Sequence, residues 1–134
     1  MYGPSITADT AKKIAPAAIA EAKKNNWTMA IAIVDTHGEL VYFERMDDVQ
    51  QGSVDVALAK ARSAARFKRP TKTFQDGLAA GGAGLRLLAL DGAVPVEGGI
   101  PLVVGGKIVG AIGASGGTSE QDGIVAAAAV AQLK

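Results

Sequence analysis

Histidine occurs once in this chain, at His37, and it is the side chain best suited to bind a metal. A neutral imidazole is a strong ligand for iron, which gives His37 a chemical use. The segment Thr36-His37-Gly38 is also typical of a tight turn between two apolar runs, where histidine tolerates a left-handed backbone. We favour the turn over the iron ligand, because loop residues are mostly exposed and variable.

Basic residues gather toward the end of a helix that Ser53 is expected to open and Pro70 to limit: Lys60, Arg62, Arg66, Lys68 and Arg69. Guanidinium groups bind carboxylates bidentately, so this helix face could hold an acidic ligand. The alternative is a solvated face, because cations stabilise a helix C-terminus by ~0.3–1 kcal/mol. Arg69, directly before Pro70-Thr71, is the strongest single candidate for ligand binding.

Two glycine clusters, Gly98-Gly99 and Ser115-Gly116-Gly117, could present backbone N–H groups to an anion. The dipole of a helix beginning near Thr118 would add to that attraction. Tight turns alone would also explain these glycines. Neither cluster has the spacing of a phosphate-binding loop or a dinucleotide fingerprint, so we exclude nucleotide binding.

The acidic residues favour structural roles. Asp122 fits the first turn of a helix, and Asp35 fits the cap of its turn. Glu44 and Asp47-Asp48 could form only a weak metal site, because no histidine or glutamate at ligand spacing accompanies them.

Apolar periodicity and turn residues predict the elements that must position these side chains. Helical spacing indicates helices over about 8–25 and from Ser53 onward, and an alanine-rich helix over 124–133. Strands are expected at 28–34, 40–46, 93–96, 100–104 and 107–114. Gly105-Gly106 suits a two-residue hairpin turn. Residues 71–91 are broken by glycines and only loosely helical.

Composition narrows the class of protein. With 134 residues, 49% of them hydrophobic, the chain fits one domain spanning 1–134. A net charge of +1 gives no sign of a nucleic-acid or membrane partner, and no apolar run is long enough to cross a bilayer. The lack of cysteine agrees with a cytoplasmic protein. Seventeen glycines and few aromatic residues favour a homo-oligomer, because small side chains allow close approach.

Four segments together resemble the GlcG/HbpS family, which also occurs as the C-terminal domain of PduO-type adenosyltransferases. The segments are Ala32–Val41, Arg45-Met46-Asp47, Lys60–Ala65 with Arg69-Pro70-Thr71, and Gly98–Gly117 with Asp122. The resemblance implies a mixed α/β (α+β) fold: a profilin-like three-layer α/β/α sandwich with a five-stranded antiparallel sheet. Members are described as haem-binding, haem-degrading, iron-responsive or of unknown function, and several form tetramers or octamers.

The resemblance and the residues together predict a small-ligand-binding protein. We expect it to take haem or a related tetrapyrrole at a site near a subunit interface. The expected ligand-binding residues are Arg45, Lys60, Arg69, Thr71, Gly98, Gly99 and Ser115, and His37 is the candidate for a metal ligand.

Two alternatives belong to other classes. A cofactor-independent enzyme could clamp a small organic acid with Arg69 or Arg45 and use Asp35 or Glu44 as a general base. The second alternative is a regulatory or structural oligomer. No pair of nucleophile and base stands out, so the sequence leaves catalysis open.

Overall fold

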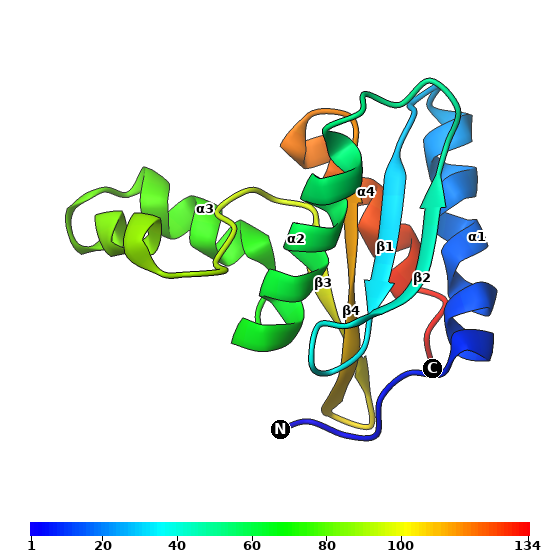
Figure 1. Cartoon of the computed structure of the whole chain (residues 1–134), viewed down its shortest axis with the longest axis horizontal. Coiled ribbons are helices and arrows are strands. Elements are labelled where there is room, and N and C mark those ends of the chain that lie inside the picture. Colours follow the sequence, from blue (N-terminus) through cyan, green and yellow to red (C-terminus); the bar gives the residue numbers. More distant parts are fainter.

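A four-stranded antiparallel sheet forms the centre of the protein (Figure 1). The computed structural model describes all residues from Met1 to Lys134. The strands are β1 (Ala30–Val34), β2 (Leu40–Arg45), β3 (Gly99–Val104) and β4 (Lys107–Ser115). Their order across the sheet is β2-β1-β4-β3, so the two hairpins lie side by side through β1 and β4.

Both hairpin turns have the chemistry that the sequence predicts. Gly105 and Gly106 have φ values of 58° and 77°, as a two-residue turn between β3 and β4 requires. In the β1–β2 turn, Asp35 Oδ1 accepts hydrogen bonds from the backbone N–H groups of His37 and Glu39, both at 2.9 Å. Gly38 completes this turn with a φ of 85°.

Helices cover both faces of the sheet. Helices α1 (Ala8–Lys24) and α4 (Ser119–Val130) lie on one face, and α2 (Ser53–Phe67) lies on the other (Figure 1). Isoleucine, leucine, methionine and valine contribute to the core under α1 and α4. The core under α2 is different, because seven of its eight buried residues are alanine. None of the helices is both long and apolar enough to span a membrane.

The expected fifth strand is absent, which corrects the five-stranded prediction. Residues 93–96 form no strand. The backbone N–H of Val94 instead donates to the Ser63 hydroxyl on α2 at 3.1 Å, which ties this segment to a helix. The only additional pairing is an isolated bridge in which Tyr2 lies parallel to Ile108 of β4.

A helical arm projects from the sandwich between α2 and β3. It consists of α3 (Thr71–Ala79) and the 3-10 helix η1 (Gly82–Ala89), and it extends away from the sheet in Figure 1. We call residues 71–89 the arm. The loosely helical character expected for 71–91 is thus observed. Leu85 and Leu88 on the arm are 56% and 72% exposed.

Candidate functional site

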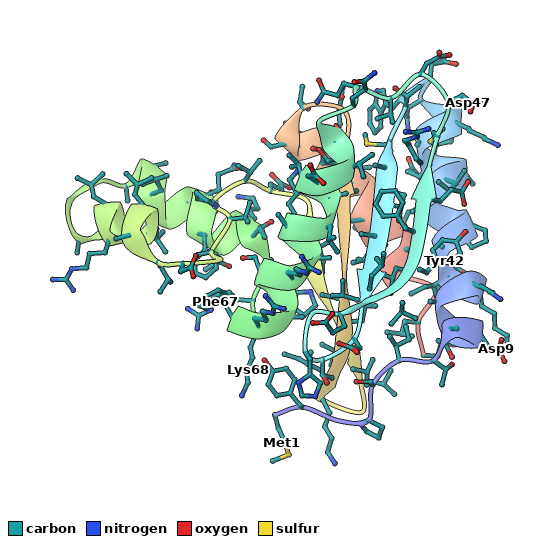
Figure 2. The ribbon with its side chains drawn as sticks, in the orientation of Figure 1. Met1, Asp9, Tyr42, Asp47, Phe67 and Lys68 are labelled. Carbon is teal, nitrogen blue, oxygen red and sulfur yellow. The ribbon has the colours of Figure 1, made fainter.

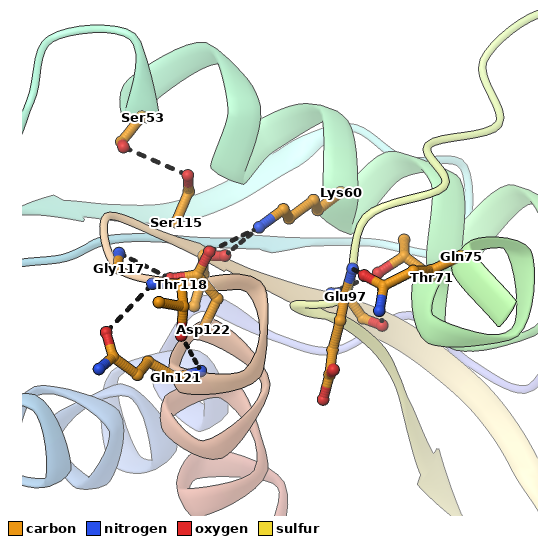
Figure 3. Close-up of polar contacts among 12 residues, drawn as sticks. Ser53, Lys60, Thr71, Gln75, Glu97, Ser115, Gly117, Thr118, Gln121 and Asp122 are labelled. Atoms are coloured by element: carbon orange, nitrogen blue, oxygen red, sulfur yellow. Dashed lines mark hydrogen bonds and ion pairs between the residues drawn. The ribbon is translucent and has the colours of Figure 1, made fainter. Parts of the chain in front are cut away.

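A buried ion pair lies where α2, β4 and α4 meet (Figure 3). Lys60 Nζ donates to Asp122 Oδ2 at 2.8 Å and to the Ala114 carbonyl at 3.1 Å. Lys60 and Asp122 are only 1% and 3% exposed. An isolated charge in such a place would be very costly, so each of these two groups depends on the other.

Asp122 also fixes the start of α4. Its Oδ1 atom accepts from the Gly117 N–H at 2.9 Å, while Thr118 and Gln121 form a capping box. The prediction that Asp122 stabilises a helix N-terminus is therefore right, but its pairing with Lys60 was not expected from the sequence. In the neighbouring part of this buried region, the hydroxyl groups of Ser115 and Ser53 are hydrogen-bonded to each other at 3.2 Å.

The Gly98-Gly99 backbone separates the ion pair from a pocket. A Cβ on Gly98 would meet Lys60 Nζ at 2.8 Å, and its φ of 135° also disfavours a side chain. The Gly99 N–H donates to Thr71 Oγ1 at 2.9 Å, which joins β3 to the first residue of α3. Because these glycines lack side chains, α2 and α3 can lie close to the edge strand β3.

The pocket outside these glycines has a volume of about 230 Å³. We call it the glycine pocket; it is lined by Pro70, Lys72, Glu97, Gly98, Gly99, Ile100, Gly123 and Ala127. The hydrogen bond from Lys72 to Asp76 at 2.8 Å raises the pKa of Lys72 and keeps it cationic. The Glu97 N–H is held by Gln75 Oε1 at 2.8 Å, as Figure 3 shows.

The structure brings together some of the predicted ligand residues and separates others. Gly98 and Gly99 line the glycine pocket, and Thr71 lies directly behind it. Lys60 and Ser115 belong to the buried region instead, with their polar atoms already bonded.

Arg69 and Arg45 are both exposed but lie in different places. Arg69 Nε donates to the Phe67 carbonyl at 2.8 Å, and its guanidinium lies 5.6 Å from the centre of the Phe74 ring. Arg69 directly precedes the pocket residue Pro70. Arg45 ends β2, at the opposite edge of the sheet from β3 and two residues before Asp47, which Figure 2 labels.

His37 is an exposed turn residue in the structure. It is not part of any group of three or more side chains that could hold a metal ion. Its carbonyl accepts a hydrogen bond from Arg66 Nε at 2.9 Å, and the next carbonyl, of Gly38, accepts one from Arg62 Nε at 3.0 Å. This docking of two arginines of α2 on the β1–β2 turn was not expected, because no local pattern links segments so far apart in the chain.

Tyr42 on β2 donates to Glu44 Oε1 at 2.8 Å. This hydrogen bond, with partial burial and the negative charge of Glu44, raises the pKa of Tyr42 above its ordinary value of 10.0. The Oε1 atom of Glu44 is therefore already engaged by the Tyr42 hydroxyl.

The sequence matches the model of a known protein family. The family model described as "Haem degrading protein HbpS-like" matches residues 6–131. The chain belongs to the HbpS-like family. Among curated relatives of this HbpS-like chain, an uncharacterised 15.0 kDa protein of Citrobacter freundii is 37% identical over 128 residues, covering 94% of the chain and 90% of the relative. Protein GlcG of Escherichia coli is 39% identical over 95 residues, covering 71% and 69%.

Solved structures of HbpS-like proteins share the fold. A double mutant of Streptomyces reticuli HbpS superposes with a TM-score of 0.89 at 29% identity, covering 100% of this chain and 90% of that one. A complex of PduOC with haem superposes with a TM-score of 0.86 at 28% identity, covering 97% and 96%. The predicted GlcG/HbpS resemblance is confirmed.

Proposed function

We propose that this HbpS-like chain binds haem or a related tetrapyrrole at the glycine pocket, next to a subunit interface. The observation that carries the proposal is the haem complex of PduOC, whose chain has the same fold along nearly its whole length. The family description, which names haem degradation, supports the same class of ligand.

The chemistry of the glycine pocket suits one edge of such a ligand. Ile100, Ala127 and Pro70 offer apolar surface for a macrocycle. Arg69 beside the pocket offers a cation for a propionate group, which guanidinium binds through charge-assisted hydrogen bonds. Lys72 at the pocket is a second cation, and it would exchange its ion pair with Asp76 for one with a propionate. His37 does not line this pocket, so within one subunit the proposed site offers no imidazole to the iron.

The size of the pocket argues for a site that a second subunit completes. Its 230 Å³ is below the ~300–1,000 Å³ of typical small-molecule sites, which enclose most of their ligand. The pocket lies at the root of the arm, since Pro70 and Lys72 flank the first residue of α3. A subunit that covered the exposed leucines of the arm would therefore lie close to the rest of the ligand.

Titration of haemin, followed at the Soret band, tests the proposal. Arg69→Ala removes a propionate partner worth about 1.5–3 kcal/mol, so we expect roughly a tenfold or greater loss of affinity. His37→Ala should change the affinity less, and Lys12→Ala, an exposed substitution on α1, serves as the control.

Two results would contradict this placement. One is normal binding by Arg69→Ala combined with loss of the ligated-iron spectrum in His37→Ala, which would move the site to the β1–β2 turn. The other is the absence of any saturable spectral change when haemin is added to the unaltered protein.

A further inference from the structure

A second concave site lies on the outer side of α2, away from the glycine pocket. Its volume is about 270 Å³, and its lining residues come from α2 and from the segment that returns from the arm: Asp55, Leu58, Ala59, Arg62, Arg66, Gly92, Ala93 and Val94. We call it the arginine cleft. Only Gly92, Ala93 and Val94 come from outside α2, and the bond from Val94 N–H to Ser63 fixes them against the helix.

The two arginines of the cleft make their hydrogen bonds within the chain through their Nε atoms. Arg62 Nε and Arg66 Nε donate to the consecutive carbonyls of Gly38 and His37. The glycine is needed there, because a Cβ on Gly38 would meet Arg66 Nε at 2.6 Å. Neither guanidinium makes another hydrogen bond within the chain, and each has four further N–H donors on its Nη atoms.

The charges around these donors are not balanced. Arg62 and Arg66 are one helical turn apart, a spacing at which like charges destabilise a helix. The single carboxylate paired with them is Glu39, which lies 3.8 Å from Arg66 Nη2 and is itself 68% exposed. An anion between the guanidinium groups would relieve this repulsion, and it would find both side chains already oriented.

The other end of the cleft has the opposite charge. Asp55 precedes Arg62 by two turns of α2, about 10 Å along the helix at ~1.5 Å per residue. Leu58 and Ala59 lie between these ends and give the cleft an apolar middle. The cleft is thus complementary to a short molecule with a carboxylate at one end and a hydrogen-bond donor at the other.

We propose that the arginine cleft binds a small organic monocarboxylate that carries a hydroxyl or amino group a few carbons from the carboxylate. Arg62 and Arg66 hold the carboxylate through their Nη groups, and Asp55 accepts a hydrogen bond from the far end. A dicarboxylate of similar length is disfavoured, because its second carboxylate would face Asp55. This ligand is independent of the tetrapyrrole proposed for the glycine pocket.

Isothermal titration calorimetry at low ionic strength tests the cleft with two probes, 4-hydroxybutyrate and succinate. We expect saturable binding of 4-hydroxybutyrate at millimolar concentration and weaker binding of succinate. Arg62→Lys keeps a positive charge and a donor for the Gly38 carbonyl but loses the planar fork, so affinity should fall about tenfold. Arg86→Lys, on the exposed arm and outside the cleft, is the matched control.

Asp55→Asn tests the proposal without touching the arginines. Removal of the negative charge should shift the preference between the probes toward succinate by roughly tenfold, a change that simple loss of folding cannot produce. Failure of 4-hydroxybutyrate to saturate at millimolar concentration would overturn the proposal. So would an unchanged affinity in Arg62→Lys or an unchanged preference in Asp55→Asn. Because no haem is added, these outcomes are separate from those of the haemin titration.

Discussion

Lys60 carries a charge that is almost wholly withdrawn from water, and Asp122 is the carboxylate that balances it. Removal of one member of a buried pair leaves the other uncompensated, which costs more than the pair itself contributes. The pair also connects α2 to the start of α4 through two residues that are 62 positions apart in sequence. One side-chain contact therefore links two helices that lie on opposite faces of the sheet.

Lys60→Met should lower the free energy of unfolding by about 3–5 kcal/mol, because Asp122 then remains buried without its partner. Urea denaturation followed by circular dichroism measures this change. The control is Lys24→Met, which breaks an ion pair with Glu21 whose lysine is 70% exposed; it should cost at most about 1 kcal/mol. Equal effects of the two substitutions would show that the buried pair has no special role.

On sequence grounds, Lys60 was grouped with the arginines as a ligand residue. Its position on α2 could have identified it as a buried residue instead. Lys60 lies between Ala57, Ala61 and Ala64, which all face the sheet. A lysine within an apolar stripe indicates a buried partner. Which carboxylate that partner is depends on the tertiary fold, since Asp122 lies in a different helix.

At the scale of elements, α2 lies unusually close to β4. A Cβ on Gly113 would overlap the Ala57 carbonyl oxygen and would come within 2.7 Å of the Ala61 backbone nitrogen. Both of these are backbone atoms, so no side-chain rotation could make room. The glycine that weakens a strand interior is explained here by the approach of a helix rather than by a ligand.

Gly113→Ala should therefore destabilise the protein by roughly 1–3 kcal/mol, because α2 must move away from the sheet. Gly52→Ala is the matched control. A Cβ added at Gly52 would have nothing within 4 Å, and the residue has an ordinary helical φ of −61°, so alanine there should stabilise by about 0.4–1 kcal/mol. Thermal melts of the two variants should move in opposite directions, and a rise in the Tm of Gly113→Ala would refute this explanation of the glycine.

Local chemistry predicted most of the elements. The Gly105-Gly106 turn and the turn from Asp35 to Glu39 defined both hairpins, and Thr118 marked the start of α4. The segment at 93–96 was wrongly assigned as a strand because its apolar residues resemble one. Its hydrogen bond goes to Ser63, a partner that no local pattern could indicate.

At the scale of the whole molecule, the arm is the part of the chain that exposes several leucines. Leu85, Leu88 and Leu90 are exposed on or next to it, at 56%, 72% and 43%. Clustered leucines at a surface are typical of protein–protein contact. The homo-oligomer expected from composition remains a prediction, and we expect its subunit interface to include the arm.

Light scattering should give several times the chain mass of 13.5 kDa at micromolar concentration. Leu88→Glu places a charge on the arm and should shift the mass toward that of a single chain. Leu40→Glu alters a 49% exposed leucine on β2, far along the sheet from the arm, and should leave the mass unchanged. A single-chain mass for the unaltered protein would contradict the prediction.

The two cores of this molecule differ in how they tolerate sequence change. Under α1 and α4, Ile14, Ile31 and Leu102 can be exchanged for other aliphatic residues of similar volume. Under α2 seven of the eight buried side chains are already methyl groups, and almost every alternative amino acid is larger. Fewer substitutions should therefore be tolerated under α2 than at the large aliphatic positions of the opposite layer, and this restriction keeps the helix that bears Lys60, Arg62 and Arg66 in position.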